Sequence, residues 1–140
     1  MKIDYSKDTF TQEEKDLMKE ESEIIREKNP EFIPILILIN SNVLTIVKHK
    51  FLIPKHISVI SLINTIKKKL IGLQHSDILS LHIIKFSGSE KRIKLDSTYD
   101  DLSIIYETHK DPETDLLVIK ISRNTSYKSV KNYVFKFIGW

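Results

Sequence analysis

The chain has 140 residues, of which 41% are hydrophobic and 29% are charged, and its formal net charge at pH 7 is +3. This length fits one domain of ordinary size. The sequence contains no cysteine and only three glycines, which excludes disulfide scaffolds, thiolate metal sites, thiol catalysis and Gly-rich phosphate-binding loops.

The N-terminal segment, residues 1–31, is rich in acidic residues and predicts a helix over 11–28. Thr11 and Glu14 have the spacing of a capping box, and Pro30 ends the helical pattern. Because this segment becomes strongly charged within twenty residues, it has no apolar core of a signal peptide, and we expect a cytoplasmic protein.

The middle of the chain predicts a hairpin followed by a helix. Residues 32–39 form a continuous apolar run, residues 43–53 form a second strand-like run, and the polar residues 40–42 between them are typical of a turn. Ser58 then precedes apolar residues that recur at helical spacing as far as Leu70, which predicts an N-capped amphipathic helix.

The remaining pattern returns to strands. It predicts strands over 79–86, 92–95 and 116–121, with a short helix capped by Thr98 and Asp101 before the last of them. This element order indicates an α+β fold in which one sheet packs on one amphipathic helix.

A ubiquitin-like β-grasp, in which the helix leads to a parallel central strand, is the commonest such arrangement. We therefore expect an N-terminal helical extension over 1–31, a β-grasp domain over 32–122 and a basic, aromatic tail over 123–140. The lysines do not form an Arg-rich stripe and the histidines lack metal-ligand spacing, so we expect no nucleic-acid binding, metal, cofactor or catalytic residue.

Five segments occur in the order and near the spacings of a known family. They are residues 19–25, the Ile-Pro-Ile-Leu of 33–36, the Lys-Phe-Leu-Ile-Pro of 50–54, the helix of 59–70 and the Tyr-Glu-Thr-His-Lys-Asp of 106–111. Together they resemble the autophagy ubiquitin-like modifiers of the GABARAP and microtubule-light-chain type over residues 19–122. The resemblance implies a monomeric protein that recruits partners carrying an aromatic-x-x-aliphatic motif, which adds a strand to the edge of the sheet.

The resemblance also implies two pockets for that motif. The aromatic pocket would be lined by Glu21, Ile25, Pro34, Leu36, Lys50, Leu52 and Leu116. The aliphatic pocket would be lined by Phe51, Ile53, Pro54, Ile57 and Leu62. Lys50, with Lys48 and Lys69, would meet the acidic residues that flank such motifs.

Core packing is an equally good explanation for Leu36 and Leu62, because helix and strand faces need apolar filling whatever the function. Phe51 and Ile53 are harder to explain in that way. Strand alternation cannot place Lys50, Phe51 and Leu52 on one face of a sheet, so some apolar groups of 50–54 must face outward.

Family members carry a Phe-Gly pair about six residues after the last strand. A cysteine protease removes the residues after the glycine, and E1-like and E2-like enzymes join the glycine to phosphatidylethanolamine. Tyr127 and Lys128 occupy that place here, whereas Gly139 precedes the terminal Trp140. We predict removal of Trp140 and conjugation through Gly139 on an autophagosomal or other organelle membrane.

Alternatives for the tail and for the whole protein remain open. The tail could be an ordered strand, a membrane-surface patch or a partner-binding segment. The protein could then be a peptide-binding adaptor that is not conjugated. It could also be the relative in the same pathway that is conjugated to protein.

Overall fold

The computed structural model describes residues 2–7, 9–41, 44–74, 77–87, 93–95 and 101–125. Three helices lie in this part of the chain: α1 (Gln12–Lys28), α2 (Val59–Lys69) and α3 (Leu102–His109). The strands are β1 (Phe32–Asn40), β2 (Thr45–Ile46), β3 (Lys50–Pro54), β4 (Leu70–Ile71), β5 (Asp77–Ile84), β6 (Ile93–Lys94) and β7 (Leu117–Thr125).

Local capping chemistry sets where the helices begin. Thr11 and Glu14 form the predicted capping box at α1, and the Ser58 side chain caps α2 by accepting the Ser61 N–H, which confirms both predictions. The predicted cap of α3 is wrong in detail. Asp101 itself is the N-cap, accepting the N–H of Ser103, and Thr98 lies outside the described residues.

The main sheet has the strand order β3-β1-β7-β5-β6, so β3 and β6 are its edges. Its central pair, β1 and β7, is parallel, as expected in a ubiquitin-like β-grasp. The first strand of this sheet after α2 is not the parallel one, however, because β5 pairs antiparallel with β7. The parallel partner of β1 is therefore β7, which is central in the sheet and comes last along the chain.

The apolar run of 43–53 is divided between two strands rather than forming the single strand predicted. Thr45 and Ile46 pair with β4, whereas Lys50–Pro54 pairs antiparallel with β1. Val47, between them, is 87% exposed. The chain thus pairs first with β4 and then with β1, and this change of pairing partner interrupts the strand.

The later strands are also displaced from their predicted ends. β5 begins at Asp77, and β7 continues to Thr125, which pairs with Asp77. The last strand therefore runs three residues past residue 122, where we expected the domain to end, and residues 126–140 lie outside the described part of the chain.

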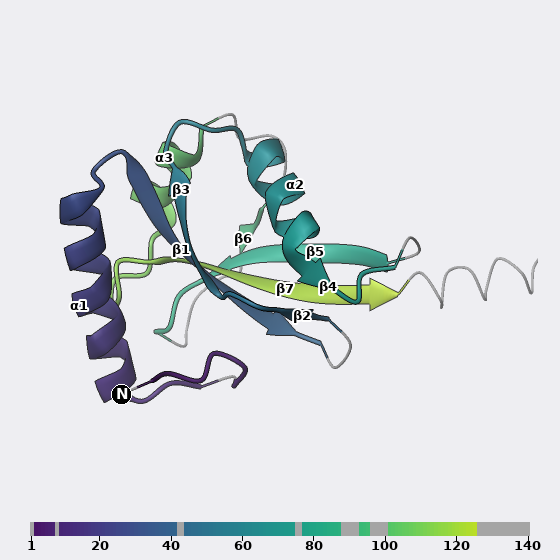
Figure 1. The fold of residues 1–140 in the computed structure, drawn as a ribbon, viewed down its shortest axis with the longest axis horizontal. Helices are drawn as coiled ribbons and strands as arrows, with labels where there is room; N and C mark the ends of the chain where they lie inside the picture. Colours follow the sequence, from purple (N-terminus) through teal and green to yellow (C-terminus); the bar gives the residue numbers. More distant parts are fainter. Residues whose placement is uncertain are drawn as a thin grey trace, which may run out of the picture.

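Strand alternation gives the sheet two apolar faces, one covered by α1 and the other by α2 and α3. Ile35 of β1 contributes to a core with α2 and α3, whereas Leu36 and Leu38 contribute to a second core with Met18 of α1. Ile3 from the N-terminal segment joins this second core. Figure 1 shows the result, with α1 on one side of the sheet and α2 and α3 on the other.

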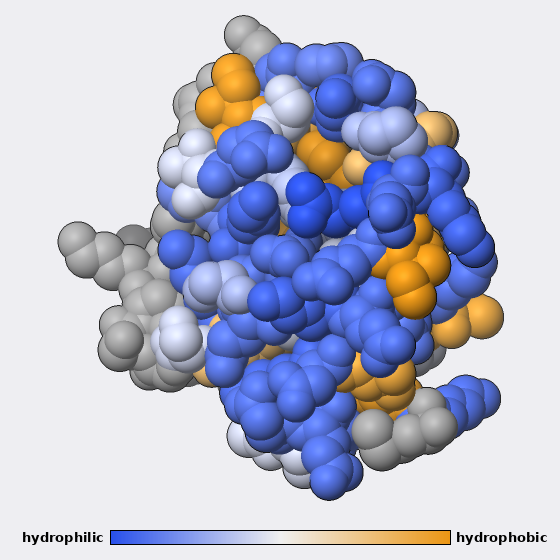
Figure 2. Space-filling model, turned by 90° about the vertical axis from the view of Figure 1, so that its left-hand side faces the viewer, coloured by the Kyte–Doolittle hydropathy of each residue, from blue (hydrophilic) through white to orange (hydrophobic). Residues whose placement is uncertain are grey.

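The surface on the α1 side is mostly hydrophilic. Figure 2 shows this side as a blue surface interrupted by separate hydrophobic patches, and Ile24 and Ile25 of α1 are among the exposed apolar residues. Within the described part of the chain, no helix combines the length and apolar character needed to cross a membrane.

Candidate functional site

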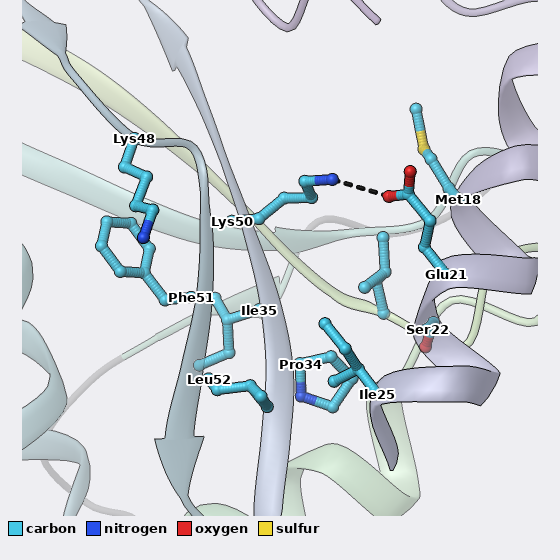
Figure 3. A pocket seen from close by; sticks show the side chains of 11 residues that line it. Met18, Glu21, Ser22, Ile25, Pro34, Ile35, Lys48, Lys50, Phe51 and Leu52 are labelled. Carbon is cyan, nitrogen blue, oxygen red and sulfur yellow. Dashed lines mark hydrogen bonds and ion pairs between the residues drawn. The ribbon is translucent and has the colours of Figure 1, made fainter. Parts of the chain in front are cut away.

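A pocket of about 360 Å³ lies between α1, β1 and β3, and we call it the α1 pocket. Figure 3 shows its walls, with helical side chains facing those of the two strands. The lining residues are Met18, Glu21, Ser22, Ile25, Pro34, Ile35, Lys48, Lys50, Phe51, Leu52 and Leu116. Since this lining is largely apolar and the volume falls in the range of small-ligand pockets, the α1 pocket can hold one large side chain.

An ion pair spans the α1 pocket. The Lys50 Nζ donates to the Glu21 Oε2 at 2.6 Å, joining β3 to α1 (Figure 3). Partial burial lowers the pKa of the Lys50 ammonium, but the hydrogen bond to Glu21 and neighbouring negative charge outweigh it, so that the pKa lies above its usual value. Both side chains are more than 40% exposed, so the pair contributes little to folding and is free to exchange partners.

The N-terminal segment contacts the Lys50 side chain through the ring of Tyr5. The Lys50 Nζ lies 5.5 Å from the centre of the Tyr5 ring, which itself stacks on His49 with ring centres 5.8 Å apart. Burial raises the pKa of the Tyr5 phenol, so it is neutral beside the ammonium at physiological pH. His49 is fixed in turn, because its Nδ1 lies 2.9 Å from the carbonyl oxygen of Ile37.

A second, much smaller pocket lies between β1, β3 and α2, and we call it the α2 pocket. It is lined by Ile35, Ile37, Phe51, Ile53, Leu62, Thr65, Ile66 and Lys69. Its volume is about 10 Å³, which is too small for an aliphatic side chain. The Lys69 Nζ lies 5.7 Å from the centre of the Phe51 ring at this pocket.

The structure brings most of the predicted aromatic-pocket residues together. Six of the seven line the α1 pocket: Glu21, Ile25, Pro34, Lys50, Leu52 and Leu116. Leu36 does not line it, because this side chain is fully buried in the core beneath α1. Lys48, predicted as a charged neighbour, lines the pocket as well.

The predicted aliphatic pocket is only partly assembled. Phe51, Ile53 and Leu62 line the α2 pocket, with Lys69 beside them. Ile57 instead packs against the core between the sheet and its helices, and Pro54 is exposed at the end of β3. Gly139 and Trp140 lie outside the described residues.

Sequence reasoning missed Met18, Ser22 and Ile35 of the α1 pocket. Met18 and Ser22 lie on the helical face of Glu21 and Ile25, because residues three and four positions apart are neighbours on a helix. That spacing is a signal that could have found them. Ile66 of the α2 pocket carries the same signal, because it lies four positions after Leu62 on α2, whereas Ile37 of β1 carries none.

Between the two pockets, β3 offers a free edge. It pairs with β1 on one side and has no strand partner on the other among the described residues. An exposed edge can accept an extended peptide through backbone hydrogen bonds. The arrangement of this site therefore suits peptide binding. The described residues contain no group of three or more His, Asp or Glu side chains placed to hold a metal ion.

Comparisons with known proteins agree with the fold and with the resemblance noted in the sequence. The family model described as "Autophagy protein Atg8 ubiquitin like" matches residues 17–127. A search of curated protein sequences found no match. Among solved structures, the crystal structure of Trypanosoma brucei ATG8 matches with a TM-score of 0.65 and 22% identity, covering 85% of this chain and 97% of that chain.

The structural match supports the ubiquitin-like α+β fold, and the family match confirms the predicted resemblance. Residues 17–127 include every residue that lines the α1 and α2 pockets. Because this match spans most of the 140 residues, the chain belongs to the Atg8 family of ubiquitin-like autophagy proteins.

Proposed function

We propose that this protein is an autophagy modifier that recruits partners through an aromatic-x-x-aliphatic motif. The aromatic residue occupies the α1 pocket, the aliphatic residue occupies the α2 pocket, and the motif backbone pairs with the free edge of β3. The preformed apolar volume beside that edge is the observation that carries the proposal.

The spacing of the motif suits the position of the pockets. Successive side chains of an extended strand point to opposite faces of a sheet, so residues three apart also face opposite ways. The α1 pocket lies on the face covered by α1, and the α2 pocket lies on the face covered by α2. A strand added at β3 therefore directs the two motif residues toward different pockets.

The charges at the site favour a motif with acidic flanks. Lys48 and Lys50 line the α1 pocket and also an adjoining groove of about 700 Å³ beside the N-terminal segment. Lys69 stands at the α2 pocket. Carboxylates beside the motif would steer the encounter and replace Glu21 as a partner of Lys50.

Titration with a fluorescent peptide containing Trp-x-x-Leu after an acidic stretch tests this function. We expect micromolar binding to the full chain and a loss of at least about tenfold for Lys50→Glu. Lys94→Glu is the matched control, because it makes the same charge change at an exposed position on β6, the opposite edge of the sheet. Equal affinity in Lys50→Glu and the unmodified chain would refute the assignment.

We further propose conjugation to phosphatidylethanolamine through Gly139. The family membership supports this step, and Gly139 is one of only three glycines in the sequence. A cysteine protease would remove Trp140, and E1-like and E2-like enzymes would activate the new carboxylate and transfer it to the lipid amine. The protein would then divide between the cytoplasm and autophagosomal or other organelle membranes.

Intact-mass analysis of the protein recovered from its own cells tests the conjugation. The expected species lacks Trp140 and carries the mass of the lipid, and Gly139→Ala abolishes it. Recovery of only the full chain, during starvation as well as in growth, would contradict conjugation. Because Tyr127 and Lys128 replace the usual Phe-Gly pair, that outcome would favour a peptide-binding adaptor that is not conjugated.

A further inference from the structure

A third pocket, which we call the lysine pocket, lies beside the core that α1 covers. It holds about 130 Å³, and its lining residues are Lys7, Leu38, Ile39, Ile84, Lys85, Phe86 and Lys120. Three of these residues are lysines and none is acidic. None of them lines the α1 pocket or the α2 pocket, so motif recognition does not account for this concentration of positive charge.

The charge of the lysine pocket is only partly neutralised by the protein. The Lys7 Nζ donates to the Glu14 Oε1 at 2.6 Å. Lys85 and Lys120 have no ion-pair partner in the described part of the chain. The nearby Asp111 is fully buried, and its carboxylate accepts a backbone N–H of the pocket wall at 2.8 Å rather than an ammonium.

The positive charge continues from the pocket across the sheet. Lys120 of β7 pairs in register with His82 of β5, which pairs in turn with Lys94 of β6. Ile119 and Ile121 are buried in the core with α2 and α3, so Lys120 between them points to the opposite face. Basic side chains that share one face of a sheet repel each other, and an anion bound over this row would offset the repulsion.

We propose that the lysine pocket binds a phosphomonoester group, carried by a lipid headgroup or by a free inositol phosphate. Such a group has a charge of about −1.5 to −2 at pH 7 and three acceptor oxygens, which suits two lysines that lack an acidic partner. A carboxylate or a phosphodiester carries only one negative charge. A nucleic-acid strand fits less well, because the ring of Phe86 packs against Phe10, with ring centres 5.5 Å apart, instead of being free to stack on a base.

Vesicle flotation with the full, unconjugated chain tests the proposal. Phosphatidylcholine vesicles carry either phosphatidylinositol 4-phosphate or phosphatidylserine at equal total charge, and we expect tighter binding to the phosphomonoester lipid. Lys120→Gln should weaken that binding about tenfold, the scale of one hydrogen bond to a charged group. The control Lys68→Gln, which makes the same charge change at an exposed position on α2 on the other side of the sheet, should bind like the unmodified chain.

A second variant guards against loss of folding. Lys94→Gln changes an exposed residue at the end of the basic row, so it cannot disturb the core, and it should weaken binding about threefold. The Tm of Lys120→Gln should not fall, because no ion pair is lost; if it does fall, Lys94→Gln decides the outcome. The basic tail of residues 123–140 is the same in all variants and cannot produce a difference between them.

Inositol 1,4-bisphosphate, the soluble headgroup of the same lipid, distinguishes the two sources of the phosphate. Calorimetric binding that Lys120→Gln weakens would mean that the pocket accepts the free compound, whereas binding to vesicles alone would assign it to the lipid. Equal binding to the two kinds of vesicle, or equal binding by Lys120→Gln and Lys68→Gln, would overturn the proposal. A Trp-x-x-Leu peptide should bind Lys120→Gln as it binds the unmodified chain, so this inference can fail while motif recognition stands.

Discussion

The two pockets beside β3 differ in how far each exists before a partner arrives. The α1 pocket holds about 360 Å³, whereas the α2 pocket holds about 10 Å³, roughly the minimum for one water. Both are lined by Ile35 and Phe51, so the same strands build an open pocket on one face and a closed one on the other.

The two helices place different side chains against β3. On the α1 side, the ion pair of Lys50 with Glu21 joins the strand to the helix across the pocket. On the α2 side, Lys69 lies over the Phe51 ring. A preformed pocket saves the cost of reorganisation on binding, so the aromatic residue in the α1 pocket should dominate the affinity. The aliphatic residue should enter the α2 pocket only after Phe51 and Lys69 move.

The largest effect is expected from Phe51→Ala, because this side chain lines both pockets. Affinity for a Trp-x-x-Leu peptide should fall about 30-fold or more, as for other central aromatic anchors. Isothermal titration calorimetry measures it. The control is Phe32→Ala, which removes a partly exposed ring on β1 outside the lining of either pocket; a similar loss in both variants would mean that Phe51 has no special place at the site.

A smaller effect is expected from Tyr5→Leu, which tests how the α1 pocket is held open. This change removes the ring beneath the Lys50 ammonium and the stack on His49. Because Lys50 must then be ordered on binding, peptide affinity should fall about threefold. Tyr5→Phe keeps the ring and should bind like the unmodified chain, so equal losses in the two variants would exclude the ring contact as the cause.

Much of the fold was predictable because its determinants are local. The capping box at Thr11 and the cap at Ser58 involve residues three positions apart, and both hold in the structure. The division of 43–53 into two strands was not predictable in this way. It depends on pairing with β4, which lies more than twenty residues further along the chain.

The site residues were predictable where one element supplies them. They were less predictable where the packing of a helix on the sheet determines which side chains line a pocket and which are buried. The alternation along 50–54 does place Lys50 and Leu52 at the α1 pocket and Ile53 at the α2 pocket. Leu36 has the face expected of a pocket residue, but the position of Met18 of α1 over this part of the sheet leaves it in the core instead. No sequence pattern fixes where a helix lies across a sheet.

The smallest effect is expected from Lys69→Ala, which tests whether the α2 pocket is closed by Lys69. A peptide with uncharged flanks is used, so that losing a lysine costs no attraction to acidic residues. Without the ammonium over Phe51, affinity for Trp-x-x-Leu should rise about twofold, the scale of an exposed cation–π contact. Lys68→Ala, which removes the adjacent lysine outside the pocket lining, should have no effect.

A Trp-x-x-Ala peptide, which leaves the α2 pocket without a large side chain, should bind both variants as it binds the unmodified chain. If Lys69→Ala strengthens both peptides equally, the gain comes from somewhere other than the α2 pocket, and the contrast between an open and a closed pocket loses its explanation.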